Sequence, residues 1–134
     1  MPLVTIYFQL HQPFRLHPDR DKFLWDRRNR QIFLKVAEKC YLPATRMFAA
    51  LVARHPGFKV TLSMSGTFLE QAELYRPEVV RAVQELLDAG KERGQVELLD
   101  ETYYHSLTSL FADPKKQEFR DQVSLHRERM RKVF

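Results

Sequence analysis

The segment LVTIYFQLHQP, residues 3–13, decides the fold, because a short apolar run ends abruptly in polar residues and a proline. β-branched and aromatic side chains fill residues 3–10, which is typical of a buried strand, and Pro13 cannot continue it. Two later runs have the same character, at residues 58–64 (FKVTLSM) and 95–99 (QVELL), and a glycine precedes each. The sequence therefore predicts three buried strands.

Amphipathic stretches separate these strands. Apolar residues recur at helical spacing over residues 31–41 and 43–55, so we expect two helices between the first and second strands. Thr67 and Glu70 have the spacing of a capping box, which predicts that the next helix begins at Thr67. The chain between the second and third strands is therefore also helical.

The rest of this helical pattern is set by prolines and a glycine. Pro77 restarts the helix that Thr67 opens, and Gly90 ends it. Asp113-Pro114 predicts the start of a last helix. Its apolar face carries Phe119, Val123, His126, Met130 and Val133.

Strands alternating with helices predict an α/β fold, with parallel strands and crossover helices. At 134 residues the chain is long enough for one core and too short for two domains. The last helix reaches Phe134 without a stop signal. We therefore expect residues 1–134 to be the N-terminal portion of a larger domain, with an exposed strand edge that favours self-association.

Composition narrows the class of protein. No apolar run approaches the ~20 residues that cross a bilayer, so we expect no membrane partner. The first ten residues lack the features of a secretory signal, and Cys40 has no second cysteine to pair with. We expect Cys40 to be buried and the protein to be cytoplasmic.

The net charge of +5 raises the question of nucleic-acid binding. Most basic residues fall within 15–30 and 115–132, and acidic residues are interleaved with them in both segments. A nucleic-acid-binding protein more typically has an unbalanced basic stripe. We therefore expect no nucleic-acid partner.

Candidate functional residues follow from the rule that parallel α/β folds gather them beyond the carboxyl ends of strands. The rule selects residues 11–15, 63–66 and 100–106. The first and third segments are rich in titratable, hydrogen-bonding and aromatic groups. Such a mixture suits sugars, whose hydroxyl groups need hydrogen bonds and whose apolar faces stack on aromatic rings.

Each candidate also has a structural interpretation. His11 is equally explained as a polar residue at a strand end, and Tyr104 as a core or interface aromatic. Glu97 alternates with apolar residues in a strand expected to be covered on both faces, so we expect it to be partly buried and to need an ion-pair partner or a ligand. His11 and His105 lack tight metal-ligand spacing, and no phosphate-binding loop is present, so we expect no metal and no cofactor.

Three motifs in this order, His11-Gln12-Pro13, GQVELL at residues 94–99 and ETYYHSL at residues 101–107, resemble glycoside hydrolase family 57, in particular its amylase-like branch. The resemblance implies an incomplete (β/α)7 barrel, of which this chain would supply the first three βα units. It also implies a retaining enzyme acting on α-glucans, such as an α-amylase or a 4-α-glucanotransferase, with an α-glucan or maltooligosaccharide as substrate.

The same resemblance assigns roles to residues. It places His11, Glu97 and His105 at the cleavage subsite, with Gln12 and Tyr104 as further substrate-binding candidates. The family's nucleophile is a glutamate after the fourth strand and its acid/base is an aspartate from a later strand. Both lie beyond residue 134, so the chain alone should lack catalytic residues and hydrolyse nothing.

Two alternatives from other classes remain open. One is a metal-dependent carbohydrate deacetylase on a similar barrel, with His11 and His105 as metal ligands. The other is a non-catalytic remnant that binds a glucan or a partner protein. Stoichiometric zinc would favour the former, and glucan binding without turnover the latter.

Overall fold

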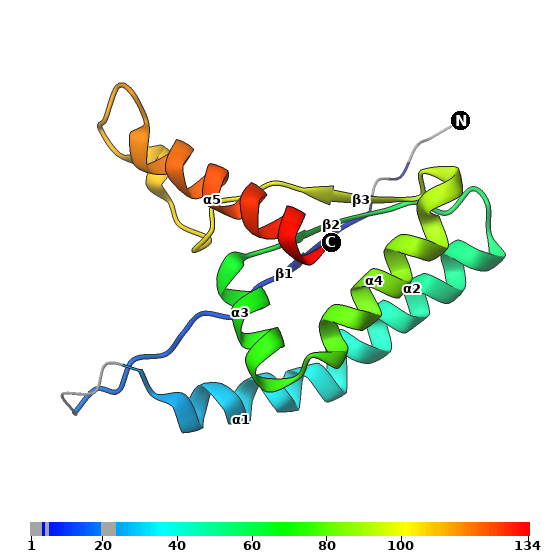
Figure 1. Ribbon diagram of the computed structural model, residues 1–134, viewed down its shortest axis with the longest axis horizontal. Coiled ribbons are helices and arrows are strands. Elements are labelled where there is room, and N and C mark those ends of the chain that lie inside the picture. Colours follow the sequence, from blue (N-terminus) through cyan, green and yellow to red (C-terminus); the bar gives the residue numbers. More distant parts are fainter. Residues whose placement is uncertain (1–3, 5, 20–23) are drawn as a thin grey trace.

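A computed structural model describes residue 4, residues 6–19 and residues 24–134. Three parallel strands form one sheet in the order β1-β2-β3 (Figure 1). They are β1 (Tyr7–Leu10), β2 (Val60–Met64) and β3 (Val96–Leu99). All three predicted strands are confirmed, although the first was expected to begin at residue 3, and residues 1–3 and 5 lie outside the described part of the chain.

Helices follow each strand (Figure 1). They are α1 (Asp26–Val36), the π-helical turn η1 (Ala37–Tyr41), α2 (Leu42–Arg54), α3 (Gly66–Tyr75), α4 (Glu78–Gly90), the 3-10 turns η2 (Lys91–Arg93) and η3 (Thr108–Leu110), and α5 (Gln117–Val133). The α/β class predicted from the sequence, with parallel strands and intervening helices, is thereby confirmed.

The sequence predicted two separate helices over residues 31–41 and 43–55, and this separation is wrong. The helical backbone runs from α1 through η1 into α2 without a break. Pro43 lies in the first turn of α2 and has no N–H to donate to the preceding turn. The wider π turn just before it gives the proline ring room, so the helix continues.

Two helix starts differ from the sequence-based prediction. Ser65 caps α3, because its Oγ accepts the N–H of Phe68 over 3.3 Å, so the capping box predicted at Thr67 and Glu70 is wrong. Helix α5 begins at Gln117 rather than directly after Asp113. The Asp113 carboxylate still accepts the N–H of Gln117 over 2.7 Å, which lowers the pKa of this carboxyl group.

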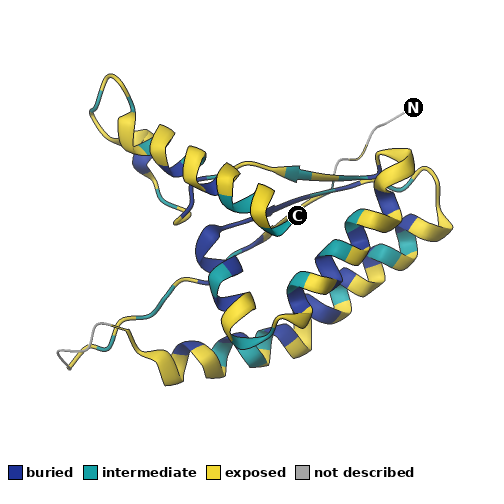
Figure 2. Cartoon of the chain, viewed as in Figure 1, coloured by how far each residue is buried: buried dark blue, intermediate teal, exposed yellow. Residues whose placement is uncertain are grey.

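The two faces of the sheet differ in their covering. Val60, Leu62 and Met64 of β2 are buried in the apolar core on the helix-covered face. Helices α2 and α4 lie side by side against this face (Figure 1), and their inward sides are buried (Figure 2). The opposite face carries Tyr7 and Leu99, which are 49% and 40% exposed.

The sequence-based predictions that Glu97 and Cys40 are buried are both wrong. Glu97 points to the open face of β3 and is exposed, because the described residues do not cover this face as the sequence argument assumed. Cys40 belongs to the π-helical turn and is also exposed rather than buried.

Within the described residues, no helix is both long and apolar enough to cross a membrane.

Candidate sugar-binding site

The turn between β2 and α3 lies between the two other strand ends and contacts both. The N–H of Ser65 donates to Leu10 O over 3.1 Å, which ties the turn to the end of β1. The N–H of Gly66 donates to Tyr103 O over 2.8 Å, which ties it to the loop after β3. Three loops that are distant in sequence therefore meet at the carboxyl edge of the sheet.

Gly66 is required for this approach. A Cβ at residue 66 would lie 2.4 Å from ring atoms of Tyr103, closer than any side chain tolerates. The Tyr103 ring is buried, and its hydroxyl donates to Glu70 Oε1 over 2.6 Å. Burial, together with this hydrogen bond, raises the pKa of Tyr103. The loop after β3 is thus fixed against α3.

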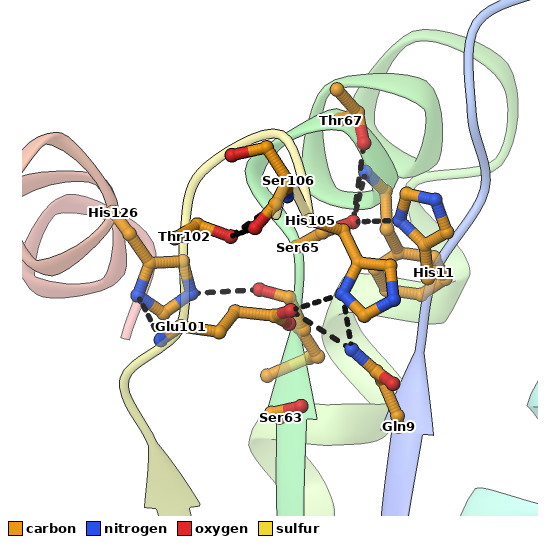
Figure 3. A network of polar contacts seen from close by, with 12 residues as sticks. Gln9, His11, Ser63, Ser65, Thr67, Glu101, Thr102, His105, Ser106 and His126 are labelled. Carbon is orange, nitrogen blue, oxygen red and sulfur yellow. Dashed lines mark hydrogen bonds and ion pairs between the residues drawn. The ribbon is translucent and has the colours of Figure 1, made fainter. Parts of the chain in front are cut away.

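His11 leaves the end of β1 and points toward this turn (Figure 3). Its Nδ1 lies 2.7 Å from Ser65 Oγ, and Ser65 Oγ lies 3.1 Å from Thr67 Oγ1. The His11 and His105 rings are 4.5 Å apart between centroids. Burial lowers the pKa of His11, and the nearby His105 lowers it further against the opposing effect of Glu101. His11 is therefore held as a neutral imidazole near neutral pH.

The loop after β3 supplies Glu101 and His105, which form a network with Gln9 of β1 (Figure 3). Gln9 Nε2 lies 2.9 Å from Glu101 Oε2 and 2.7 Å from His105 Nδ1. His105 Nδ1 is also 3.1 Å from Glu101 Oε2. A neutral His105 accepts the Gln9 amide proton at Nδ1, and a protonated His105 donates to the carboxylate instead.

The backbone of His105 is in the left-handed region, with φ of 54°. This conformation is unfavourable for a residue with a Cβ and persists only where the surroundings enforce it. Thr102 provides that enforcement, since its Oγ1 accepts the N–H of Ser106 over 2.9 Å and its carbonyl accepts the N–H of His105 over 2.9 Å. The strained turn directs the imidazole toward Gln9 and His11.

His126 supports the same loop from α5. It is fully buried, and its Nε2 donates to Met64 O over 2.8 Å. With the proton on Nε2, the other ring nitrogen accepts the N–H of Glu101 at 3.5 Å. His126 therefore joins the ends of β2 and β3.

A cavity of about 360 Å³ opens beside this network. Its lining includes Gln9, Glu101 and His105, together with Tyr7 and Phe119. The Oε1 atom of Glu101 is buried and has no hydrogen-bond partner among the described residues. The cavity therefore combines imidazole, carboxylate and amide groups with aromatic rings, which is the mixture that sugar binding uses.

The structure brings some of the sequence-predicted site residues together. His11 and His105 meet at the carboxyl edge of the sheet, as expected. Tyr104 is 54% exposed beside them, with its ring packed edge-on against Tyr103 at 4.9 Å between centroids. Its sugar-stacking role stays a prediction.

The Gln12 side chain is turned toward the interior, and its substrate-binding role stays a prediction. It is 8% exposed, and its Nε2 donates to Tyr41 Oη over 2.9 Å. The guanidinium of Arg15 donates to Gln12 Oε1 over 3.3 Å, and Gln71 Nε2 donates to Gln12 O over 2.7 Å. These contacts hold the loop after β1 and thereby place His11.

Glu97 is not brought to the two histidines. It pairs with Thr61 in the sheet and lines a groove with Lys59 at the amino end of the strands. Glu101 lies four positions further along the chain, about 13 Å at ~3.3 Å per residue. Retaining glycosidases need two carboxylates ~5–5.5 Å apart, so Glu97 and Glu101 do not form such a pair.

Gln9 lies outside the segments selected from the sequence, whereas Ser65 and Glu101 lie inside them but were not named as site residues. Gln9 lies within a mostly apolar strand and not after its end, where candidates were sought, and its contact with His105 spans 96 positions. Ser65 carried a signal, because a serine directly before a helix is a favoured N-cap. Glu101 was visible after the third strand, but nothing in the sequence indicated its pairing with Gln9.

The histidines do not assemble a metal site within the described residues. No group of three histidine, cysteine, aspartate or glutamate side chains in this part of the chain is arranged to hold a metal ion. The Nδ1 atoms of His11 and His105 are already engaged by Ser65 and by Gln9. The deacetylase alternative therefore gains no support from the geometry.

Comparison with known proteins identifies the family. The sequence model of glycosyl hydrolase family 57 matches residues 5–134. The chain belongs to this family. The resemblance drawn from the His11-Gln12-Pro13, GQVELL and ETYYHSL motifs is confirmed.

Several family 57 relatives resemble this chain along nearly all of its length. A Methanocaldococcus jannaschii protein, provisionally named an alpha-amylase, is 36% identical over 140 residues, which are 98% of this chain and 28% of that protein. The alpha-amylase of Pyrococcus horikoshii is 28% identical over 99% of this chain and 18% of that enzyme. The alpha-amylase of Pyrococcus abyssi is 26% identical over 99% of this chain and 17% of that enzyme. The chain thus spans 17% to 28% of the length of these relatives.

A solved structure shows the same fold. The crystal structure of a 4-alpha-glucanotransferase from Thermococcus litoralis matches with a TM-score of 0.64 over 96% of this chain and 17% of that chain, at 22% identity. The three parallel strands and their helices are therefore the first three βα units of the incomplete (β/α)7 barrel predicted from the sequence.

Proposed function

We propose that these residues supply part of the sugar-binding site of an α-glucan-active glycosidase or transglycosylase. The observation that carries this proposal is the convergence of His11, from the loop after β1, with Glu101 and His105, from the loop after β3, at the open edge of a parallel sheet. Imidazole nitrogens and a carboxylate at such an edge offer donors and acceptors for sugar hydroxyl groups. The alpha-amylase and 4-alpha-glucanotransferase names of the relatives support α-glucan as the substrate class.

The chemistry of bond cleavage is proposed to reside outside this chain. Glu101 is held by Gln9 and His105, and Glu97 on β3 is about 13 Å away along the chain at ~3.3 Å per residue. Neither matches the close carboxylate pair of a retaining glycosidase. The role of the described network is therefore to hold the sugar, and we expect no release of shorter sugars from maltooligosaccharides by the purified chain.

Calorimetric titration of the whole 134-residue chain tests the proposal. We expect saturable binding of maltoheptaose, an α-1,4 glucan, and none of cellohexaose, a β-1,4 glucan that is one glucose unit shorter. Loss of one imidazole in His105→Ala should weaken maltoheptaose binding at least about fivefold, because a hydrogen bond contributes roughly 1 kcal/mol. His55→Ala is the matched control, since His55 is exposed after α2 and away from the network.

Two results would contradict the proposal. One is equal affinity for the α-linked and β-linked sugars, or no binding of either. The other is an equal loss of affinity in His105→Ala and His55→Ala, because it would show that the imidazole network is not the site.

A further inference from the structure

The hydroxyl group of Ser65 has three polar neighbours, and their hydrogen-bonding capacities constrain the proton on His11. The N–H of Phe68 donates to Ser65 Oγ, His11 Nδ1 lies 2.7 Å away, and Thr67 Oγ1 lies 3.1 Å away. A serine hydroxyl donates one proton and accepts up to two. Because the backbone N–H can only donate, one proton and one acceptor position of Ser65 remain for His11 and Thr67.

Two arrangements satisfy this count. In the first, Ser65 donates its proton to His11 Nδ1 and accepts the hydroxyl proton of Thr67. In the second, His11 donates from Nδ1 to Ser65, and Ser65 donates to Thr67. The two arrangements place the proton of a neutral His11 on opposite ring nitrogens, Nε2 in the first and Nδ1 in the second.

The burial of Thr67 distinguishes them. Thr67 is 7% exposed, and among the described residues its hydroxyl has Ser65 as its hydrogen-bond partner. The second arrangement leaves the Thr67 hydroxyl proton buried without an acceptor, which costs free energy. The first arrangement gives every hydroxyl proton of the group an acceptor, so it is favoured.

The surroundings also disfavour a charged His11, which would need to donate from Nδ1. The ring lies at the N-terminus of α3, where the helix dipole repels a cation. The titratable groups facing His11 are His105 and Glu101, both from the loop after β3. The first turn of α3 adds no acidic residue that could stabilise an imidazolium ion.

We propose that Ser65 is a positioning residue that holds His11 as the neutral imidazole with its proton on Nε2. Among the described residues the His11 ring has a hydrogen bond only at Nδ1, so Nε2–H is available to donate. The acceptor of this Nε2 proton is a hydroxyl or ring oxygen of the bound glucan. Only the identification of the acceptor as a glucan rests on the proposed function. Ser65 thus acts through His11 and does not itself contact the sugar.

Ring nitrogen resonances of the intact chain test the proposal without any ligand. Long-range ¹H–¹⁵N spectra recorded against pH should show His11 protonated at Nε2 and unprotonated at Nδ1 near neutral pH. In Ser65→Ala the neutral form loses its hydrogen-bond donor, so the pKa of His11 should rise and both tautomers should be populated. A wild-type spectrum with the proton on Nδ1 would overturn the proposal, as would unchanged His11 resonances in Ser65→Ala.

Two further variants separate this role from a merely structural one. Ser63→Ala is the matched control, because Ser63 is also buried and its Oγ lies 2.7 Å from Tyr7 Oη, so His11 should be unaffected. Thr67→Val keeps the Ser65 cap of α3 and, among the described residues, leaves His11 Nδ1 as the acceptor for the Ser65 proton, so the proton of His11 should stay on Nε2. If Ser65→Ala fails to fold, a Thr67→Val spectrum with the His11 proton on Nδ1 overturns the proposal by itself.

Glucan titration then distinguishes the two proposals. Ser65→Ala should weaken maltoheptaose binding about fivefold, the loss expected for one hydrogen bond, while His55→Ala binds normally. Absence of glucan binding by a wild-type chain that shows the Nε2–H tautomer refutes the proposed function alone. Normal glucan binding with the proton on Nδ1 refutes the role of Ser65 alone.

Discussion

The two ends of the sheet use polar side chains in opposite ways. At the amino end, Gln95 is 1% exposed, and its Nε2 donates to the carbonyl groups of Val52, His55 and Phe58 over 3.2, 2.9 and 2.7 Å. At the carboxyl end, His11 and His105 contact other side chains and are only partly covered. A polar group bound to backbone carbonyls maintains the fold, whereas a network of side chains at an open edge is available to a ligand.

The largest expected effect is at the amino end. Gln95→Ala removes the donor from three carbonyl groups that hold the turn before β2. We expect the free energy of unfolding to fall by about 2–4 kcal/mol, at roughly 1 kcal/mol per hydrogen bond. Denaturant titration measures the loss, and folded Gln95→Ala should bind maltoheptaose normally.

Gln84→Ala is the control for this variant. Gln84 also donates one side-chain hydrogen bond, to Asp88 Oδ1 over 3.0 Å, but the pair is exposed on α4. Its loss should change the free energy of unfolding by less than about 0.5 kcal/mol. Equal losses in the two variants would remove the contrast between the buried clamp and the surface.

The next effect concerns the turn that carries Ser65. Gly66→Ala places a methyl group 2.4 Å from the Tyr103 ring, and we expect a loss of about 1–3 kcal/mol from overpacking. Displacement of Tyr103 should also move His105 and weaken glucan binding. Gly57→Ala is the matched control, because nothing lies within 4 Å of its new Cβ and its φ is not in the left-handed region. Equal stability of the two variants would show that the close packing of Tyr103 is unimportant.

A variant of Glu97 tests whether the sugar-binding site extends toward the amino end of the sheet. It is exposed on the open face of β3, and no hydrogen bond to it is present among the described residues. Glu97→Gln should therefore leave the free energy of unfolding within about 0.5 kcal/mol of wild type. The sequence-based prediction that Glu97 binds sugar requires an affinity loss of about fivefold. Unchanged affinity would confine the site to the carboxyl end.

The smallest effect is a dependence on pH. Burial lowers the pKa of His11 below its ordinary 6.5, so the unfolded chain takes up a proton more readily than the folded chain as the pH falls through 6.5. Stability should therefore fall from about pH 6.5 downward until the folded-state pKa is passed. His11→Asn, which does not titrate, should show a weaker fall between about pH 7 and pH 5. Parallel curves for the two proteins would contradict a depressed pKa.

The sequence predicted the strands and helices well because their signals are local. Apolar runs and helical spacing were sufficient to place β2, β3 and α2 to within a few residues. The start of α3 was misplaced because Ser65 and Thr67 are both good caps, and only the contact of Ser65 with Phe68 N–H decides between them. The burial of Glu97 was wrong because local alternation does not reveal which face of a sheet is covered.

The site was only partly predictable. His11 and His105 followed from the rule on strand ends and from the family motifs. Their contacts with Gln9 and Ser65 did not, because those contacts join residues 96 and 54 positions apart. Gln12 stands in the same motif as His11, yet its side chain is turned inward to Tyr41. A motif places residues along the chain, and only packing decides which of them face the open edge.

The most direct test of the account is a titration of the intact chain with maltoheptaose, followed through the ring resonances of its histidines. The account predicts saturable changes at His11 and His105, with His55 and the buried His126 unaffected. Cellohexaose should cause none of these changes. Shifts at His55 with none at His11 and His105, or no saturable shift at all, would contradict a sugar-binding site at the carboxyl edge of the sheet.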